Sequence, residues 1–101
     1  MFSDPANLVG KTVEWEGSGR GRGKFYQGEA VLHIPPGTSN AEAMKKFASD
    51  NPKHVIRRKY LRFDPETVST SRLLVLVEQD TKRTRPTFWF YAPNINECTA
   101  I

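Results

Sequence analysis

RLLVLVEQ, residues 72–79, is apolar at five successive positions and polar or charged only at its ends. Side chains along a strand point alternately to the two faces of a sheet, so a run that is apolar on both faces predicts a strand covered on both sides. We therefore expect residues 72–79 to form the central strand of the fold, with the other elements arranged around it.

Three other segments are predicted to be strands. Residues 11–16 and 24–34 each alternate between apolar and polar side chains, and residues 17–23 between them are rich in glycine. This pattern indicates an antiparallel hairpin. Residues 87–91, which include four aromatic side chains, form the last strand.

One helix is predicted after the second strand. Ser39 followed by Glu42 is a capping box, in which the serine side chain accepts a hydrogen bond from the first turn of a helix. The apolar spacing predicts a stripe that packs against the sheet, made of Ala41, Met44, Phe47 and Ala48. Asn51 and Pro52 end the helix.

Residues 54–63, HVIRRKYLRF, also resemble a strand, but strict alternation places apolar and basic side chains together on both faces. An edge strand, a bulge near Arg57 and Arg58, or a barrel wall with a partly polar inner face would each account for this mixture.

The predicted class is α+β, mostly β, with a single domain over residues 1–101. We expect about five strands in a small, strongly bent antiparallel sheet or barrel, with one α-helix inserted between the second and third strands. A chain of this length buries one hydrophobic core. The size and the density of hairpins resemble small barrels of the SH3-like, Tudor-like and OB types, although no motif of those families matches residue by residue.

The net charge of +4 is unevenly distributed along the chain. Residues 1–52 hold six basic and six acidic side chains, whereas residues 53–101 hold nine basic and five acidic ones. A concentrated positive charge attracts polyanions, so nucleic acid is the first partner to consider.

Cysteine and histidine are scarce in this sequence. Cys98 is the only cysteine and has no partner for an internal disulfide, and His33 and His54 are too few for a closed zinc site. No stretch approaches the ~18 apolar residues of a membrane span, and the N-terminus lacks a signal-peptide pattern. We therefore expect a cytoplasmic binding module rather than an enzyme, with no membrane association, no metal, no cofactor and no catalytic residue.

The stretch SGRGRGKFY, residues 18–26, invites comparison with a phosphate-binding loop. A Walker loop ending at Gly23 and Lys24 requires glycine at position 18 and a hydroxyl side chain at position 25, where this chain has Ser18 and Phe25. The segment is instead predicted to be a hairpin tip, either a basic tip that reaches toward phosphates or a solvated turn.

Basic and aromatic side chains are interleaved, and this combination is typical of surfaces that neutralise a nucleic-acid backbone while stacking bases. The candidate residues for binding nucleic acid or another anion are Arg20, Arg22, Lys24, Lys53, Arg57, Arg58, Lys59 and Arg62. The candidate stacking or pocket residues are Trp15, Tyr26, Tyr60, Trp89 and Tyr91. Nucleic-acid binding is the leading hypothesis.

Two other hypotheses stay open. A barrel could enclose an apolar or anionic small ligand, with Arg58 and Arg62 turned inward, provided that a carboxylate or the ligand offsets the cost of burying their charge. Alternatively, the aromatic residues of segment 87–91 could form a protein-interaction or homodimer surface.

Overall fold

The structure of the protein is a computed structural model that describes residues 5–17, 23–54, 56–79 and 87–101. Its helical elements are α1 (Pro5–Leu8), α2 (Asn40–Asp50) and the 3-10 turns η2 (Arg58–Tyr60) and η3 (Ile95–Glu97). Its strands are β1 (Thr12–Glu16), β2 (Phe25–Ile34), β3 (Arg72–Glu78), β4 (Phe88–Tyr91) and β5 (Thr99–Ala100). None of the helices in these ranges is long and apolar enough to cross a membrane.

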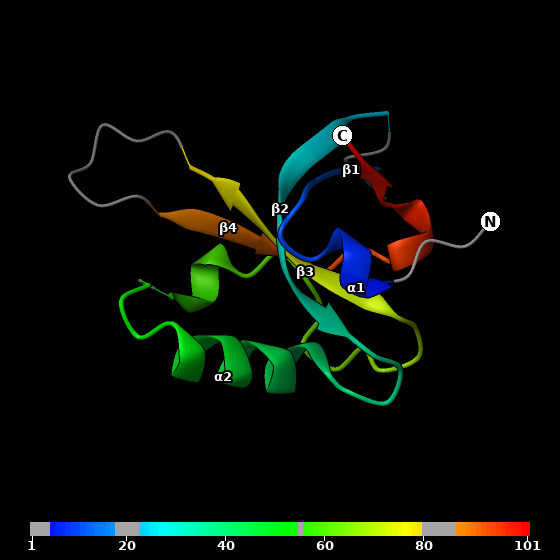
Figure 1. Ribbon diagram of the computed structural model, residues 1–101. Coiled ribbons are helices and arrows are strands. Elements are labelled where there is room, and N and C mark those ends of the chain that lie inside the picture. The colour runs from blue at the N-terminus through cyan, green and yellow to red at the C-terminus, as the bar shows by residue number, and fades with distance from the viewer. Residues whose placement is uncertain (1–4, 18–22, 55, 80–86) are drawn as a thin grey trace.

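The five strands form one antiparallel sheet in the order β4-β3-β2-β1-β5, and α2 packs beside one end of it (Figure 1). The predicted class is confirmed, because the chain is mostly strand and α2 lies between β2 and β3. The sheet is open rather than closed into a barrel, since its outer strands β4 and β5 lie at opposite edges. Of the two predicted arrangements, the bent sheet is therefore the correct one.

Strand β3 is buried on both faces, as its apolar run predicts. Leu74 and Leu76 pack into one hydrophobic core, and Leu73 and Val75 pack into another on the opposite face. The first, called here the helix-side core, contains Ile34, Ala43, Met44, Phe47, Tyr60, Leu74, Leu76 and Phe90. The second, the hairpin-side core, contains Leu8, Val13, Trp15, Ala30, Leu73 and Val75.

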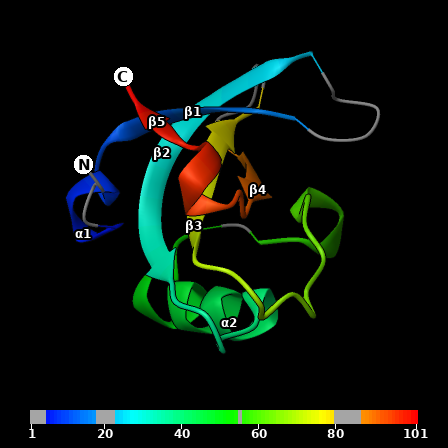
Figure 2. The same ribbon diagram turned by 90° about the vertical axis from the view of Figure 1, so that its right-hand side faces the viewer.

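Strand β2 changes partner along its length and curves as it does so (Figure 2). Its residues 25–29 pair with β1, and residues 29–34 pair with β3. Gly28 lies at this change of partner, where a Cβ atom would approach the carbonyl oxygen of Leu76 to 2.4 Å. The register also shifts between Ala30 and Leu32, which is a bulge and adds to the bend.

Ser39 caps the start of α2 as predicted, and its side chain accepts a hydrogen bond from the backbone N–H of Glu42 at 3.1 Å. The buried face of α2 differs from the predicted stripe and consists of Asn40, Ala43, Met44 and Phe47. Ala41 is half-buried and Ala48 is exposed. The buried stripe begins one residue earlier than predicted, at Asn40. This polar residue can be buried because its side chain makes hydrogen bonds inside the fold.

The prediction of a strand at residues 54–63 is wrong. Residues 58–60 form the turn η2, and only Leu61 makes a β-bridge, parallel to Phe90 of β4. The backbone N–H of Arg62 donates to the carbonyl oxygen of Phe90 at 2.8 Å, which holds the segment against the sheet edge. The turn explains the mixed pattern, because three successive basic residues are exposed while Tyr60 is buried, and Ile56, Leu61 and Phe63 pack partly against the same core. The fifth strand is instead β5, near the C-terminus.

Candidate functional site

The basic segment, residues 53–62, presents a cluster of exposed cations beside the edge strand β4. Its basic residues are Lys53, Arg57, Arg58, Lys59 and Arg62, and all five are exposed. None of them forms an ion pair with a carboxylate in the described part of the chain. Lys24 is also exposed, next to β2, whereas Arg20 and Arg22 lie outside the described residues.

Two of these cations lie against aromatic rings. The guanidinium of Arg62 lies 4.2 Å from the ring centroid of Trp89, and the Lys59 ammonium lies 5.6 Å from that of Tyr60. The Tyr60 and Trp89 rings meet edge to face, with centroids 5.5 Å apart. Tyr60 is only 3 % exposed and belongs to the helix-side core, so the accessible ring of this pair is the half-buried Trp89.

The other three predicted aromatic residues come together on the hairpin side of the sheet. The ring centroids of Trp15, Tyr26 and Tyr91 are 5.4–5.8 Å apart pairwise. Trp15 is 5 % exposed, and the two tyrosines are half-buried. Sequence spacing gives no reason to group these residues, because they are brought together by β1, β2 and β4 from across the sheet.

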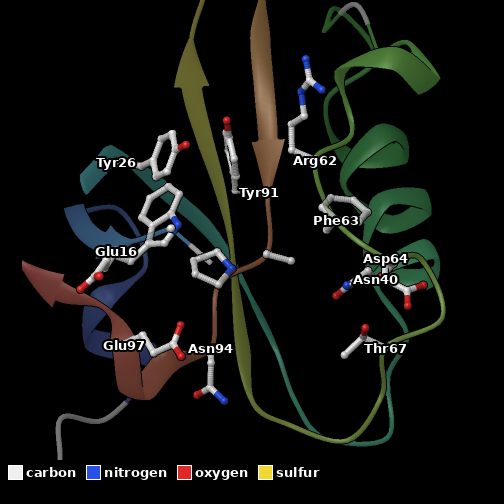
Figure 3. A pocket seen from close by; sticks show the side chains of 14 residues that line it. Glu16, Tyr26, Asn40, Arg62, Phe63, Asp64, Thr67, Tyr91, Asn94 and Glu97 are labelled. Carbon is white, nitrogen blue, oxygen red and sulfur yellow. Dashed lines mark hydrogen bonds between the residues drawn. The ribbon is translucent and has the colours of Figure 1, made fainter. Parts of the chain in front are cut away.

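These three rings form one wall of a pocket of about 360 Å³ (Figure 3). The opposite wall carries Arg62, Phe63 and Asp64 from the segment that follows the turn η2 (Figure 3), and residues 92–94 also line the pocket. The described residues that line the pocket are Trp15, Glu16, Gly17, Tyr26, Asn40, Arg62, Phe63, Asp64, Thr67, Tyr91, Ala92, Pro93, Asn94 and Glu97. The pocket therefore joins the aromatic cluster to the basic segment through Arg62.

Four charged side chains of the described residues line this pocket, and Asp64, whose Oδ1 accepts a hydrogen bond from the backbone N–H of Glu66 at 2.9 Å, stands on the same wall as Arg62 (Figure 3). Arg62 lies at one end, and Glu16 and Glu97 lie toward the opposite end (Figure 3). One Glu16 carboxylate oxygen accepts a hydrogen bond from the backbone N–H of Gly23 at 3.2 Å. The carboxylate of Glu97, on η3, accepts no hydrogen bond from any group of the described residues. The pocket thus has a cationic end and an acceptor-rich end.

A buried arginine holds the wall opposite the aromatic cluster. Arg72 is 2 % exposed, and it was expected from the sequence only as the charged end of a strand. Its guanidinium donates to the side-chain oxygen of Asn40 and to the carbonyl oxygen of Thr67, the latter at 2.5 Å. It also donates to the carbonyl oxygens of Thr38 at 2.6 Å and Thr70 at 2.8 Å. Two pocket residues, Asn40 and Thr67, are therefore positioned by Arg72.

Burial shifts the pKa of several groups near the pocket. Loss of solvation lowers the pKa of Arg72. Burial, helped by the nearby Tyr26, raises the pKa of Tyr91, and the positive charge of Arg62 opposes this increase. Burial and the charge of Glu97 raise the pKa of Cys98 to about 11, so this thiol is protonated at neutral pH.

The two histidines have structural contacts away from the pocket. The His33 ring nitrogen Nε2 lies 2.7 Å from the Ser71 hydroxyl, and the His54 ring packs against Phe47 and Phe88. No group of three or more histidine, cysteine, aspartate or glutamate side chains within the described ranges is placed to hold a metal ion.

Comparisons with protein-family models, with curated proteins and with solved structures find no match. The grounds for a functional proposal are therefore the geometry and the charge of this site.

Proposed function

We propose that the protein binds nucleic acid through the basic segment. The observation that supports this most directly is that five cations lie within ten residues of chain, all exposed and none paired to a described carboxylate. Exposed, unpaired cations are free to replace the counterions of a phosphate backbone, and this exchange supplies most of the affinity of sequence-independent binding.

The fold adds two features that suit such binding. The basic segment is held to the sheet edge by the Leu61 bridge and by the Arg62 hydrogen bond, so its charges are presented on a fixed backbone. Arg62 stacks on Trp89, which limits the freedom of its guanidinium and leaves its N–H edges available for phosphate oxygens. A preorganised cation loses less conformational entropy on binding than a freely moving one.

The test is a titration of labelled single-stranded and double-stranded oligonucleotides at 50 and 200 mM salt. If all five cations contact phosphates of a single strand, the affinity should fall by about 100-fold between these concentrations. Absence of binding at 50 mM salt contradicts the proposal.

A matched pair of double variants tests which charges matter. Arg57→Ala plus Arg58→Ala should weaken binding about tenfold or more, since it removes two of the five expected phosphate contacts. Lys45→Ala plus Lys46→Ala removes the same charge from exposed positions on α2 and should have a much smaller effect. Equal losses in the two variants would mean that net charge, and not the basic segment, drives the interaction.

Small-ligand binding is the second candidate function, and the pocket is the observation that favours it. Trp15 and Tyr26 line the pocket, as the ligand hypothesis expects, and Arg62 does so as well. Arg58 is exposed on η2, and Tyr60 and Trp89 are not among the described lining residues. With Glu16, Asp64 and Glu97 on the lining, an apolar or anionic ligand is less suitable than one that carries hydrogen-bond donors.

The interaction-module hypothesis and the cytoplasmic location stay predictions. Phe90 is buried, and Phe88, Trp89 and Tyr91 are half-buried against the chain's own two cores, which reduces the surface available to a second subunit. Measurement of the mass in solution tests the homodimer directly.

A further inference from the structure

We infer that the pocket is a nucleobase site that selects bases carrying an amino group, guanine above the others, while the adjoining basic segment holds the neighbouring phosphates. This inference deepens the proposed function and rests on it. The basic segment accounts for the binding of nucleic acid, and the pocket accounts for which base is preferred.

The size and the walls of the pocket suit a single flat ring system. Its volume of about 360 Å³ lies at the small end of the range of ~300–1,000 Å³ found for ligand pockets. Trp15, Tyr26 and Tyr91 form an aromatic wall, and Phe63 is on the opposite wall (Figure 3). Aromatic walls bind bases through stacking, which is worth ~1–3 kcal/mol for each base.

The separated charges of the pocket match the polarity of a nucleotide. A nucleotide carries a phosphate at one end and a base edge with hydrogen-bonding groups at the other. Arg62 stands at the end where the pocket meets the basic segment, so a phosphate near Arg62 places the attached base toward Glu16 and Glu97. Three described carboxylates and an aromatic wall would also suit an organic cation, so the position of Arg62 beside the basic segment is what favours a nucleotide, and a titration with tetramethylammonium tests the cation separately.

The carboxylates determine which base is preferred. An ionised carboxylate only accepts hydrogen bonds, and its two oxygens can receive two parallel donors. Guanine presents a ring N–H beside an amino group on its Watson–Crick edge and satisfies both oxygens. Adenine and cytosine offer the amino donor beside an acceptor, whereas uracil and thymine flank their single N–H with carbonyl oxygens that the carboxylate repels.

Glu97 is the carboxylate best placed for this role. It receives no hydrogen bond from the described residues, while one oxygen of Glu16 is engaged by Gly23. The turn η3 fixes the backbone of Glu97, because the Asn94 side chain accepts from the backbone N–H of Asn96 at 3.0 Å. The capped turn fixes the backbone of this carboxylate, and its oxygens can accept hydrogen bonds from a ligand. Such a carboxylate is suited to recognising the edge of a base.

The experiment compares labelled ten-nucleotide thymidine strands that carry guanine, hypoxanthine or thymine at one central position. The guanine strand should bind about tenfold more tightly than the all-thymine strand. The hypoxanthine strand, which lacks only the amino group, should lose most of that advantage. Equal affinity for the three strands overturns the inference while leaving nucleic-acid binding itself intact.

Two variants that each remove one negative charge test whether Glu97 is the source of the guanine preference. Glu97→Gln should reduce the guanine preference to about twofold or less. Its affinity for the all-thymine strand should not decrease. Glu66→Gln changes an exposed carboxylate that does not line the pocket, and it should keep the tenfold preference. A guanine preference that survives in the double variant Glu16→Gln plus Glu97→Gln also overturns the inference.

A second measurement separates the inference from the proposed function. The indole N–H signal of Trp15, assigned with a Trp89→Phe variant, should shift with guanosine monophosphate and much less with uridine monophosphate. If that shift occurs but no strand binds at 50 mM salt, the pocket is a base site and nucleic-acid binding fails. A shift with tetramethylammonium and with neither nucleotide would identify an organic-cation site instead and refute the base assignment.

Discussion

Replacement of Arg72 by methionine should lower the free energy of unfolding by about 4 kcal/mol. Methionine keeps most of the apolar contact of the arginine stem but removes four hydrogen bonds, three of them to backbone carbonyl oxygens. A buried acceptor left without its donor costs ~1–3 kcal/mol, and the lower value applies here because the three threonines are half-buried. Domains of this size are stable by only ~5–15 kcal/mol, so the variant loses a large part of the total.

The measurement is urea unfolding followed by tryptophan fluorescence, with thermal unfolding as a second probe. A loss of about 4 kcal/mol corresponds to a decrease in Tm of roughly 15–30 °C for a domain near 100 residues. Arg57→Met is the matched control, since Arg57 is exposed and should change stability by less than ~0.5 kcal/mol. A loss below about 1 kcal/mol in Arg72→Met would refute the reasoning, because the cost of burying the guanidinium would then cancel its hydrogen bonds.

The same variant has a functional consequence that stability alone does not explain. Arg72 holds Asn40 and the carbonyl oxygen of Thr67, and both residues line the pocket. At a temperature where Arg72→Met is still folded, its preference for the guanine strand should fall while its affinity for the all-thymine strand changes little. An unchanged preference would limit the role of Arg72 to stability.

Further predictions concern Gly28, Cys98 and the contact between Arg62 and Trp89. Gly28→Ala should destabilise the protein in urea by about 2 kcal/mol or more, because its Cβ would lie 2.4 Å from the Leu76 carbonyl oxygen; a value within error of the parent contradicts that close approach. Iodoacetamide at pH 9 should modify Cys98 about 50-fold more slowly than an ordinary thiol, since burial and the neighbouring glutamate raise its pKa from 9.0 to about 11. The folded state holds this proton more tightly than the unfolded chain, so part of the stability should disappear as the pH rises from about 9 to 11, and Cys98→Ser should abolish that part. A double-mutant cycle of Arg62→Ala and Trp89→Leu in urea should give a coupling of ~0.5–1 kcal/mol for the ring contact at 4.2 Å, and zero coupling would show that the pair does not persist in solution.

The elements that the sequence predicted correctly depend on local patterns. The run at residues 72–79 becomes β3 and is buried on both faces, because five successive apolar residues cannot all be exposed. The hairpin of β1 and β2 and the Ser39 cap follow from alternation and from a motif of four residues. These features are set by neighbours in the chain, which is why the sequence alone identifies them.

The features that the sequence did not predict depend on contacts between distant residues. Arg72 is buried because Asn40 and the loops around residues 38 and 67 supply its acceptors, and a single sequence carries no record of that arrangement. Residues 54–63 fail as a strand because Tyr60 turns into the helix-side core. Of the residues singled out from the sequence, Trp15, Tyr26, Arg62 and Tyr91 line the pocket, whereas Glu97 at the acceptor-rich end was not a candidate.

A substitution at Gly28 would change the shape of the pocket without changing any residue that lines it. Residues 25–29 of β2 pair with β1 and residues 29–34 pair with β3, so Gly28 lies next to the position at which the hairpin half of the sheet meets the half that contains β3 and β4. Trp15 and Tyr26 belong to the first half, and the opposite wall is anchored to the second through Arg72. The angle between the two halves of the sheet therefore affects how Trp15 and Tyr26 lie relative to Tyr91 of β4 and to the opposite wall. A substitution at Gly28, or at the bulge around Val31, would change the angle between the two halves of the sheet. The distance from Trp15 and Tyr26 to the opposite wall of the pocket would change with it, and so would the ligands that can enter.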